Sequence, residues 1–523
     1  MNSENLDKLK NKNIIDYIKK NTNLIEDMSY RKLKFRDDFI DLVFVDSLCS
    51  TDLISNYVIK SIEELNMLDA EDFLGEKSNI KKDDKKLKWK KYIENKTQNK
   101  DDTSDLNLVL KYILEKISIN NVKEIDVKKD DIFYYLFSGF SLLIYRGDIL
   151  ALETKKGLDR TINVPTTENN VKGPKDSFIE GYITNVGLIR KRLKTEKLLL
   201  EEKKLGRCTK TKIGIMYISN IAKKEIVNTI KAKLDKIDID GIINSNQIIE
   251  LLIQKRKSDF PTIISTEKPD IVCNFLLQGR IALIIENSPF VLILPAFLTD
   301  FINNIDDKYL LNTNTFLTRI VRYIAFILTL VTPAFYVALI TFDQESIPTD
   351  LLISFAIQRD GVPFPAFFEG ILMILSFEIL RETDYRVPNA TGNTLSIVGA
   401  LILGDAAVSA GIVSPIMIIV IAVTMISGLM FSDINMVNAL RSWRLIFLIF
   451  SSVAGLYGIG ICTIFLIIKL CDISSEDKPF MYPIAPMELS VLKEEVISRK
   501  NFYDDNKRQH ILTNNITKMK IKK

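Results

Sequence analysis

The chain has 523 residues, of which 47% are hydrophobic and 26% are charged, and its formal net charge at pH 7 is +4. Charge is divided unevenly, because 95 of the first 280 residues are charged but only 23 of residues 281–470. A single soluble domain does not separate charge in this way, and the length allows about three domains. The only histidine is His510, which excludes imidazole-dependent catalysis and zinc binding from the rest of the chain.

Motifs for catalysis or cofactor binding are missing from the sequence. The five cysteines include no Cys-x-x-Cys pair, which argues against a structural zinc site. The sequence contains neither a Gly-x-x-x-x-Gly-Lys-Ser/Thr phosphate loop nor a Gly-x-Ser-x-Gly nucleophile elbow. We therefore expect a protein that is not an enzyme, with no catalytic residue, metal or cofactor. The small net charge gives no indication of a nucleic-acid partner.

The charged half repeats one order of elements: a strand, a turn, a helix and then a pair of strands. The first copy is expected at 42–46, 52–64, 141–146 and 150–153. The second copy is expected at 213–217, 222–236, 281–285 and 291–295. This order predicts an internally duplicated α/β unit, that is, two related subdomains.

The domain boundaries follow from these patterns. We expect a flexible N-terminus, two α/β subdomains, a helical membrane domain and a C-terminal tail, at 1–29, 30–160, 161–285, 286–470 and 471–523 respectively. The first subdomain contains a Lys-rich insertion at 77–104, which we interpret as a solvated, mobile segment. A contact with a membrane surface or with nucleic acid is the alternative for the insertion. The basic tail is expected either to be disordered or to lie on anionic membrane lipid.

The apolar half predicts four to six transmembrane segments, each of which needs about 20 apolar residues to cross a bilayer. Three charge-free runs are predicted to be spans: 323–342, 406–432 and 445–468. Two weaker candidates are 363–380, which carries two glutamates, and 387–404, which is interrupted by Pro388, Gly392 and Gly399. Residues 287–299 are charge-free but short, which is more typical of an interfacial or re-entrant piece. We expect an all-helical transmembrane domain.

Basic residues that flank the spans predict the orientation of the chain. Arg319 and Arg322 precede the first span, and only acidic residues follow it closely, so the large N-terminal part is expected in the cytoplasm. The next signals conflict. The Lys-rich tail and the segment with Arg441 and Arg444 both favour the inside, yet one predicted span, 445–468, separates them. The sequence leaves this conflict open.

Three acidic residues in the apolar half are candidates for intramembrane polar or pore-lining positions: Glu369, Glu378 and Asp405. Glu369 and Glu378 are nine residues apart, which places them on opposite faces of one helix. One interpretation is a pair of structural ion pairs, for example with Arg359 or Arg381. The other is that one carboxylate faces a polar lumen, because charges within a bilayer normally face protein or water.

Three long motifs in order resemble the A subunits of GerA-type spore germination receptors. The first is GPKDSFIEGYITNVGLIRKRL at 173–193, and the second joins Pro269-Asp270 and Gly279-Arg280 to Ser288-Pro289-Phe290. The third is the most specific and runs through the apolar half, with RDGVPFP at 359–365, FEILRE at 377–382 and IVGALILGDAAVSAGIVSP at 397–415. One departure is Asp405, where the family usually has glutamine.

The resemblance implies a multi-pass subunit in the inner membrane of a bacterial spore. It implies a germinant-binding B subunit and a lipoprotein C subunit as partners. It further implies that this chain forms a homo-oligomeric, nutrient-gated channel for monovalent cations. A ring of Glu369 or Glu378 side chains in such an oligomer would favour cations. Two alternatives stay open: a non-conducting scaffold subunit, and an A-type paralogue that amplifies germination with the dipicolinate channel.

Four arginines are candidates for assembly contacts. Arg190 and Arg192, at the end of the first motif, are predicted either to pack within the domain or to pair with carboxylates of a neighbouring subunit. Arg359 and Arg381 are the corresponding candidates in the helical part. The identity of the germinant does not follow from this chain, because the B subunit is expected to determine it.

Overall fold

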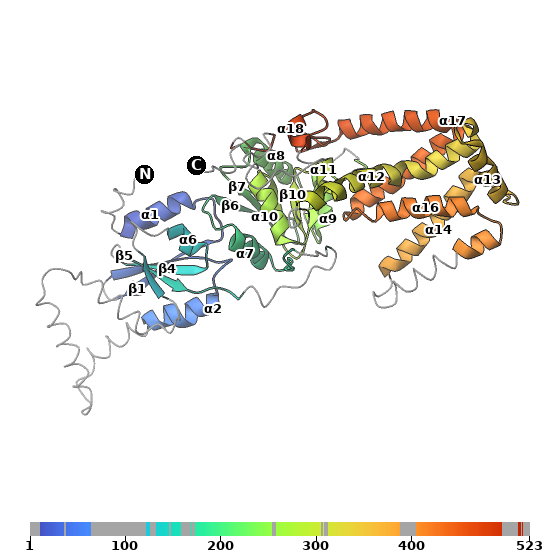
Figure 1. Cartoon of the computed structure of the whole chain (residues 1–523). Coiled ribbons are helices and arrows are strands. Elements are labelled where there is room, and N and C mark those ends of the chain that lie inside the picture. Colours follow the sequence, from blue (N-terminus) through green and yellow to red (C-terminus); the bar gives the residue numbers. More distant parts are fainter. Residues whose placement is uncertain are drawn as a thin grey trace, which may run out of the picture.

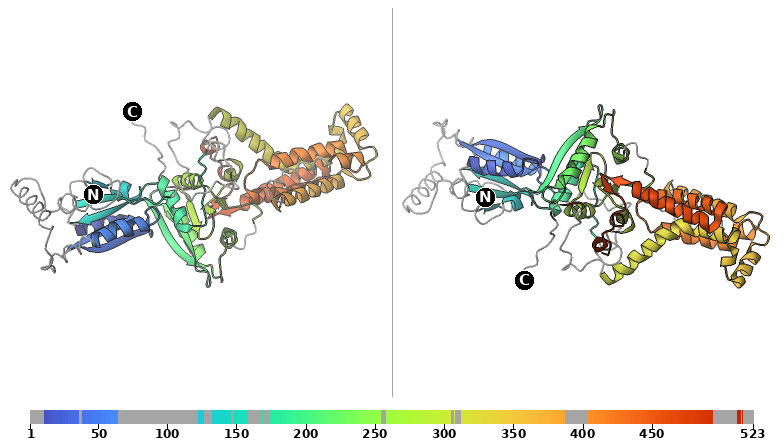
Figure 2. Two further views of the ribbon diagram at one scale, coloured as in Figure 1. Left: turned by 90° about the horizontal axis from the view of Figure 1, so that it is seen from below. Right: turned by 90° about the horizontal axis from the view of Figure 1, so that it is seen from above.

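The structure is a computed structural model, and it places two sheet-containing units at one end of an elongated molecule and a set of long helices at the other (Figures 1 and 2). It describes residues 11–35, 38–63, 122–125, 132–145, 148–157, 168, 173–253, 258–304, 307, 312–386, 404–493, 511–513 and 515. The Lys-rich insertion, the candidate span at 387–404 except for its last residue, and most of the tail after residue 493 lie outside the described residues.

The first unit is a five-stranded antiparallel sheet with the strand order β1-β2-β4-β5-β3. Its strands are β1 (Met28–Phe35), β2 (Asp38–Val45), β3 (Val122–Ile125), β4 (Phe140–Tyr145) and β5 (Asp148–Glu153). Its helices are α1 (Asn11–Asn21), α6 (Ile132–Leu136) and α2, which begins at Thr51–Leu53 and continues as a π-helix at Ile54–Ile59.

Both faces of this sheet are covered, because its strands are apolar on both sides. Successive side chains of a strand point to opposite faces, and along β2 the side chains of Leu42 and Phe44 pack with α2. Val43 and Val45 point the other way, toward α1 and α6. The unit therefore has three layers, with one helical layer on each side of the sheet.

The second unit repeats the first. Its sheet has the order β6-β7-β9-β10-β8, which is the order of the first sheet with every strand number raised by five. The strands are β6 (Leu198–Leu205), β7 (Thr211–Ile218), β8 (Ile264–Thr266), β9 (Ile281–Ile285) and β10 (Val291–Leu294). The helices are α7 (Tyr182–Arg192), α8 (Lys224–Asp235), α9 (Ser245–Ile253) and α10 (Pro269–Gln278). Two units of one topology are what the predicted duplication requires, although all strand pairs are antiparallel.

Two expected features of the N-terminal half are wrong. The N-terminus is not flexible throughout 1–29, because α1 buries Ile14 and Ile18 in the core and Met28 begins β1. The second unit does not end at residue 285, because β10 pairs with both β9 and β8. The short charge-free run at 287–299 therefore contains a buried strand of the sheet instead of an interfacial piece.

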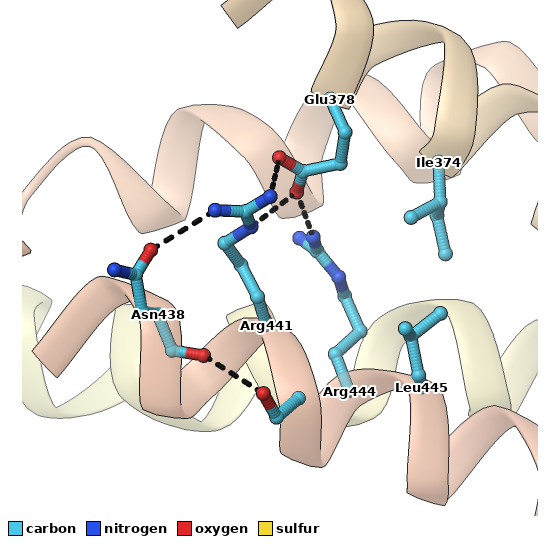
Figure 3. Close-up of a pocket in the computed structure, with 7 residues that line it drawn as sticks. Ile374, Glu378, Asn438, Arg441, Arg444 and Leu445 are labelled. Atoms are coloured by element: carbon cyan, nitrogen blue, oxygen red, sulfur yellow. Dashed lines mark hydrogen bonds and ion pairs between the residues drawn. The ribbon is translucent and has the colours of Figure 1, made fainter. Parts of the chain in front are cut away.

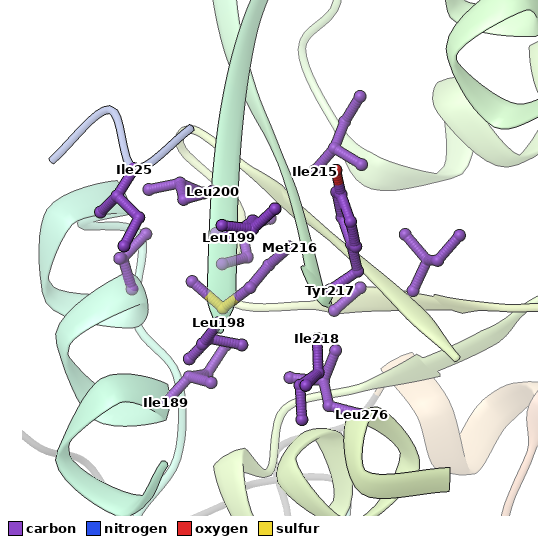
Figure 4. Close-up of a cluster of buried hydrophobic side chains, with 14 of the residues drawn as sticks. Ile25, Ile189, Leu198, Leu199, Leu200, Ile215, Met216, Tyr217, Ile218 and Leu276 are labelled. Carbon is purple, nitrogen blue, oxygen red and sulfur yellow. The ribbon is translucent and has the colours of Figure 1, made fainter. Parts of the chain in front are cut away.

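The two units share one hydrophobic core. Ile25, which follows α1, forms a bridge with Leu200 of the second sheet, and both side chains are buried. Figure 4 shows Ile25 and Leu200 side by side, close to Leu198 and Met216. Because apolar contacts run continuously from one unit to the other, we treat them as one folded body.

The apolar half is helical. Its helices are α11 (Leu298–Ile302), α12 (Asn312–Thr341), α13 (Thr349–Arg359), α14 (Ala366–Arg386), α16 (Pro415–Gly428) and α17 (Ile434–Asp472). By length and apolar composition, Phe316–Thr341 and Ile434–Asp472 could each cross a membrane. The predicted span 406–432 is not one helix, because the chain turns at Gly411, which has a φ of 65°, and α16 begins anew at Pro415.

The last long helix, α17, is a hairpin of two helices. Ala454 and Gly455 have non-helical dihedral angles. The rings of Trp443 and Phe465 lie 5.7 Å apart between centroids, whereas 22 residues of a straight helix would separate them by about 33 Å. The arms, 434–453 and 456–472, are therefore antiparallel (Figure 1). The predicted single span at 445–468 is wrong.

The hairpin returns the chain to the sheets. Residues beyond α17 form the short strands β11 (Ser474–Ser475) and β12 (Lys478–Pro479), and then α18 (Leu489–Leu492). The Ser475 hydroxyl donates to the Thr262 carbonyl (2.7 Å) and accepts from the Ala296 backbone N–H (3.1 Å). This removes the conflict in the orientation signals, because a hairpin brings the tail back to the end of the helical region at which Arg441 and Arg444 lie.

Candidate functional site

Glu369, on the first turn of α14, is almost completely buried and lies at the junction of three helices. Its Oε2 accepts from the backbone N–H and the hydroxyl of Ser414, at 2.9 and 2.8 Å, just before α16 begins. Its Oε1 pairs with the guanidinium of Arg359, at the end of α13, at 3.2 Å. Among the described residues, Glu369 therefore faces protein partners and connects the ends of α13, α14 and α16.

Glu378 lies about 2.5 turns further along α14, on the opposite side of the helix, and faces three arginines. Its Oε1 accepts from Nε of Arg441 at 2.7 Å and from Nη2 of Arg444 at 3.1 Å (Figure 3). Its Oε2 pairs with Arg441 and with Arg381, the latter at 3.4 Å. Three guanidinium groups thus surround one carboxylate at the contact of α14 with the first arm of α17.

A pocket of about 340 Å³ opens beside this cluster. Its walls are formed by the two helices, with the side chains of Ile374, Glu378, Asn438, Arg441, Ser442, Arg444 and Leu445. Asn438 accepts from Nη1 of Arg441 at 2.9 Å and so orients that guanidinium (Figure 3).

These contacts concern the expectation that Glu369 or Glu378 forms an acidic ring in an oligomer. Glu378 is outnumbered by its arginine partners, so this position presents an excess of positive charge. Asp405 lies in a short helical stretch at 404–409 and is exposed, and the described residues show no ion pair for it. Of the three acidic candidates, Glu369 and Glu378 are thus committed to pairs within the chain.

Arg190 is an internal contact and not a subunit contact. Its side chain is fully buried, and its Nε and Nη2 donate to the two carboxylate oxygens of Asp27 at 2.8 and 2.6 Å. Nη1 donates to the Leu198 carbonyl, and the guanidinium lies over the ring of Phe137. A buried, doubly hydrogen-bonded group cannot reach a neighbouring subunit, so the assembly interpretation is wrong at this position.

The other three assembly candidates are also paired within the chain. Arg192 binds both oxygens of Asp176, at 2.6 and 2.5 Å. Arg359 pairs with Glu369, and Arg381 pairs with Glu378 one turn earlier on the same helix. An intersubunit role for any of them would have to use the part of the guanidinium that these pairs leave free.

Sequence reasoning missed an ion pair at the junction of the sheets with the helices. Arg280 donates to both oxygens of Asp300 in α11, at 2.6 and 2.8 Å, and lies over the rings of Phe275 and Phe297. The Gly279-Arg280 motif was the only signal, and it did not indicate a partner. The structure also explains why α10 ends there, since Gly279 adopts a left-handed conformation.

Arg319 and Arg322, at the start of α12, have a partner in the chain. Both pair with Asp307, a nearly fully buried carboxylate, with nitrogen to oxygen distances of 3.2 and 2.8 Å. Their positive charge is therefore partly neutralised by the protein, in addition to any contact with lipid headgroups. Within the described ranges, no three His, Cys, Asp or Glu side chains are grouped so that they could hold a metal ion.

Comparison with known proteins agrees with the resemblance. A family model described as Bacillus/Clostridium GerA spore germination protein matches residues 16–511. The chain belongs to the GerA family. This GerA chain is 40% identical to spore germination protein KA of Bacillus subtilis (strain 168) over 402 residues, which are 76% of this chain and 74% of that protein. The family resemblance identified from the sequence is thus confirmed, and it assigns the GerA chain to spore germination.

Two further proteins are similar to this chain. The GerA chain is 37% identical to spore germination protein XA of Bacillus anthracis over 371 residues, which are 69% of this chain and 74% of that protein. Among solved structures, it resembles the N-terminal domain of the A subunit of the Bacillus megaterium spore germinant receptor GerK3. That match has 29% identity and a TM-score of 0.38, and it covers 55% of this chain and 95% of that one.

Proposed function

We propose that this GerA chain is the A-type subunit of a spore germinant receptor, and that it forms the ion-conducting homo-oligomer of that receptor. Its partners would be a germinant-binding B subunit and a lipoprotein C subunit. The complex would lie in the inner membrane of the spore, with the two sheet-containing units in the cytoplasm. Release of monovalent cations through the oligomer would start germination.

The exposed apolar surface of the helical region supports the membrane location best. Val453 and Tyr457 are 73% and 82% exposed, and most of the exposed large hydrophobic side chains in the described residues lie on α12, α13, α14, α16 and α17. Monomeric soluble proteins rarely expose so many large hydrophobic side chains on neighbouring helices. Helices in a bilayer need one, because their outer faces contact lipid.

The charge distribution limits how such an oligomer could conduct. A conduction path needs polar groups or an apolar constriction that can be wetted. Because arginines neutralise Glu369 and Glu378 within the chain, we do not base cation selectivity on either carboxylate. Their role in this proposal is to hold the helices that surround the path.

The experiment is cation flux from liposomes that contain the full-length chain with its B and C subunits. Addition of the germinant is expected to release the trapped cation, and omission of the A subunit should abolish the release. An assembled complex that binds germinant but releases no cation would contradict the channel proposal. It would favour the scaffold alternative. Two features of the structure also support a scaffold: the shared core of the sheet units, and their contact with the C-terminal segment.

Substitution of the two glutamates refines this test. Glu369→Gln and Glu378→Gln are each expected to lower the thermal stability of the complex while leaving the ratio of cation permeabilities unchanged. Glu345→Gln, at an exposed position after α12, is the matched control and should alter neither property. A changed permeability ratio in Glu369→Gln or Glu378→Gln would show that the carboxylate lines the path after all.

A further inference from the structure

The arginine cluster around Glu378 has more hydrogen-bond donors than its described partners can accept. Each guanidinium carries five N–H groups, whereas one carboxylate offers about four acceptor positions. The side chain of Arg444 is only 3% exposed, and its Nε has no hydrogen-bond partner. Its Nη1 reaches only the sulfur of Met425, at 3.5 Å, which is a weak acceptor. A buried donor without an acceptor is unfavourable, so the described part of this cluster is short of hydrogen-bond acceptors.

The charges around Arg444 also favour the binding of an anion. Glu378 is the one negative group among the main charged neighbours of Arg444, and Arg441 and Arg381 are both positive. Three positive charges and one negative charge leave an excess of two positive charges beside the pocket. Such an excess is costly in a low-dielectric environment unless an anion compensates for it.

The rim of the pocket is apolar on the side away from the sheets. Ile374 and Leu445 line that side. On α14, Leu375 lies three residues before Glu378, and on α17, Ile449 lies one turn beyond Leu445; these two side chains are 60% and 50% exposed. The near side faces the sheets, because Trp443 in the same arm of α17 packs on Phe260. A ligand that fits this arrangement has an anionic group at the arginines and an apolar part that lies along Leu375 and Ile449.

We propose that this pocket binds a phosphate group, presented by an anionic phospholipid in the cytoplasmic leaflet. Arg441 and Arg444 would donate to the phosphate oxygens, because guanidinium groups match phosphate geometry with two parallel hydrogen bonds. Glu378, which accepts from both guanidinium groups, would compete with the phosphate for these donors. The acyl chains would extend along the apolar rim toward the middle of the bilayer.

The test uses the full-length chain in nanodiscs of phosphatidylcholine, with and without phosphatidylglycerol, and measures lipid retention by native mass spectrometry. Arg441→Gln is expected to weaken phosphatidylglycerol binding about tenfold, which corresponds to one lost charge-assisted hydrogen bond. Glu378→Gln should strengthen binding, because it removes the competing negative charge. Lys469→Gln, which removes an exposed positive charge from the end of α17, is the control and should leave binding unchanged.

The opposite signs of the two variants keep the test informative even if both lower stability. If phosphatidylglycerol binding is the same in Arg441→Gln as in the unmodified chain, or falls equally in Glu378→Gln, the cluster is purely structural and the proposal is wrong. A third arm adds inorganic phosphate to the phosphatidylcholine nanodiscs. Stabilisation by free phosphate that is lost in Arg441→Gln, without an effect of phosphatidylglycerol, would support the phosphate site but overturn the lipid as its source.

Discussion

Arg190 shows how a charged side chain from a basic run is used inside the fold. The run Arg190-Lys191-Arg192 is typical of a solvent-facing segment. In the structure, Arg190 is buried and binds Asp27, which lies 163 residues earlier. The pair joins α7 of the second unit to the segment that precedes β1 of the first. A position within a family motif thus holds the two sheet-containing units together.

Loss of the partner of Arg190 should destabilise the protein. Asp27→Ala is expected to lower the free energy of unfolding by about 3–5 kcal/mol, because it leaves a buried guanidinium without its carboxylate. Asp238→Ala, which breaks the exposed pair with Arg207, is the control and should leave stability unchanged. Thermal unfolding of the full-length chain in detergent measures both. Dissociation of an oligomer by Asp27→Ala without loss of stability would restore the subunit-contact interpretation.

The carboxyl group of Glu168 is expected to make the stability of the protein depend on pH near neutrality. Burial raises the pKa of its carboxyl from the usual 4.5 to about 7, although Thr266 donates to it at 2.7 Å. Because the pKa is higher in the folded state, the contribution of Glu168 is fully present below about pH 4.5. It is lost as the pH rises through about 7, and the total loss is on the order of 3 kcal/mol.

The unfolding midpoint of the chain, measured across this pH range, checks the prediction. Glu168→Gln should flatten the decline in stability, since an amide does not titrate. Glu225→Gln, at an exposed carboxyl in the first turn of α8, should leave the decline as it is. An identical pH profile in Glu168→Gln and the unmodified chain would count against the raised pKa.

At the scale of elements, α17 shows why a charge-free run does not define a span. Residues 445–468 are uniformly apolar, and this pattern is the same for one helix and for a hairpin. The arms of the hairpin are about 30 and 26 Å long, which is near the thickness of the hydrocarbon core. The turn depends on Gly455, whose φ of 57° and ψ of −137° are accessible essentially to glycine alone. Asp343 then accepts from the Leu456 N–H at 2.9 Å and holds the second arm.

Substitution of this glycine should open or strain the hairpin. A Cβ at residue 455 would lie 2.5 Å from Oδ2 of Asp343 and 2.8 Å from Cβ of Phe342, so Gly455→Ala is expected to cost about 1–3 kcal/mol. Gly460→Ala is the matched control, because a Cβ there meets nothing within 4 Å and alanine favours a helix. Thermal stability in detergent distinguishes them, and equal midpoints for the two variants would contradict the described turn.

At the scale of the whole molecule, the chain after α17 connects the last helix to the second sheet unit. Phe480 packs on Phe260 and Phe301, and its carbonyl accepts from the Leu298 N–H. Lys233 of α8 pairs with Glu476, which is nearly completely buried. A displacement of the second unit would therefore act directly on the arm 456–472 through these contacts.

The native cysteines allow a test of this arrangement. Cys208, in the second unit, and Cys471, at the end of α17, are both exposed, whereas Cys49, Cys273 and Cys462 are buried. In sealed vesicles, a membrane-impermeant thiol reagent should label Cys208 and Cys471 from the same side and neither from the other. Cys208→Ser and Cys471→Ser assign each label. Labelling from opposite sides would contradict a hairpin in α17.

The sequence by itself determined three strands of each sheet, the duplication and the family. Apolar runs such as 42–46 and 213–217 lie in strands because short-range patterning of apolar residues is strong there, and the long motifs indicated the GerA family directly. The tertiary structure alone decided the partners of the charges and the path of the helices. Asp27 and Arg190 are far apart in sequence, so nothing local to either residue indicates the other. The hairpin of α17 depends on the backbone conformation of Gly455 and on its contacts with Phe342 and Asp343, just after α12, and a hydropathy pattern contains neither.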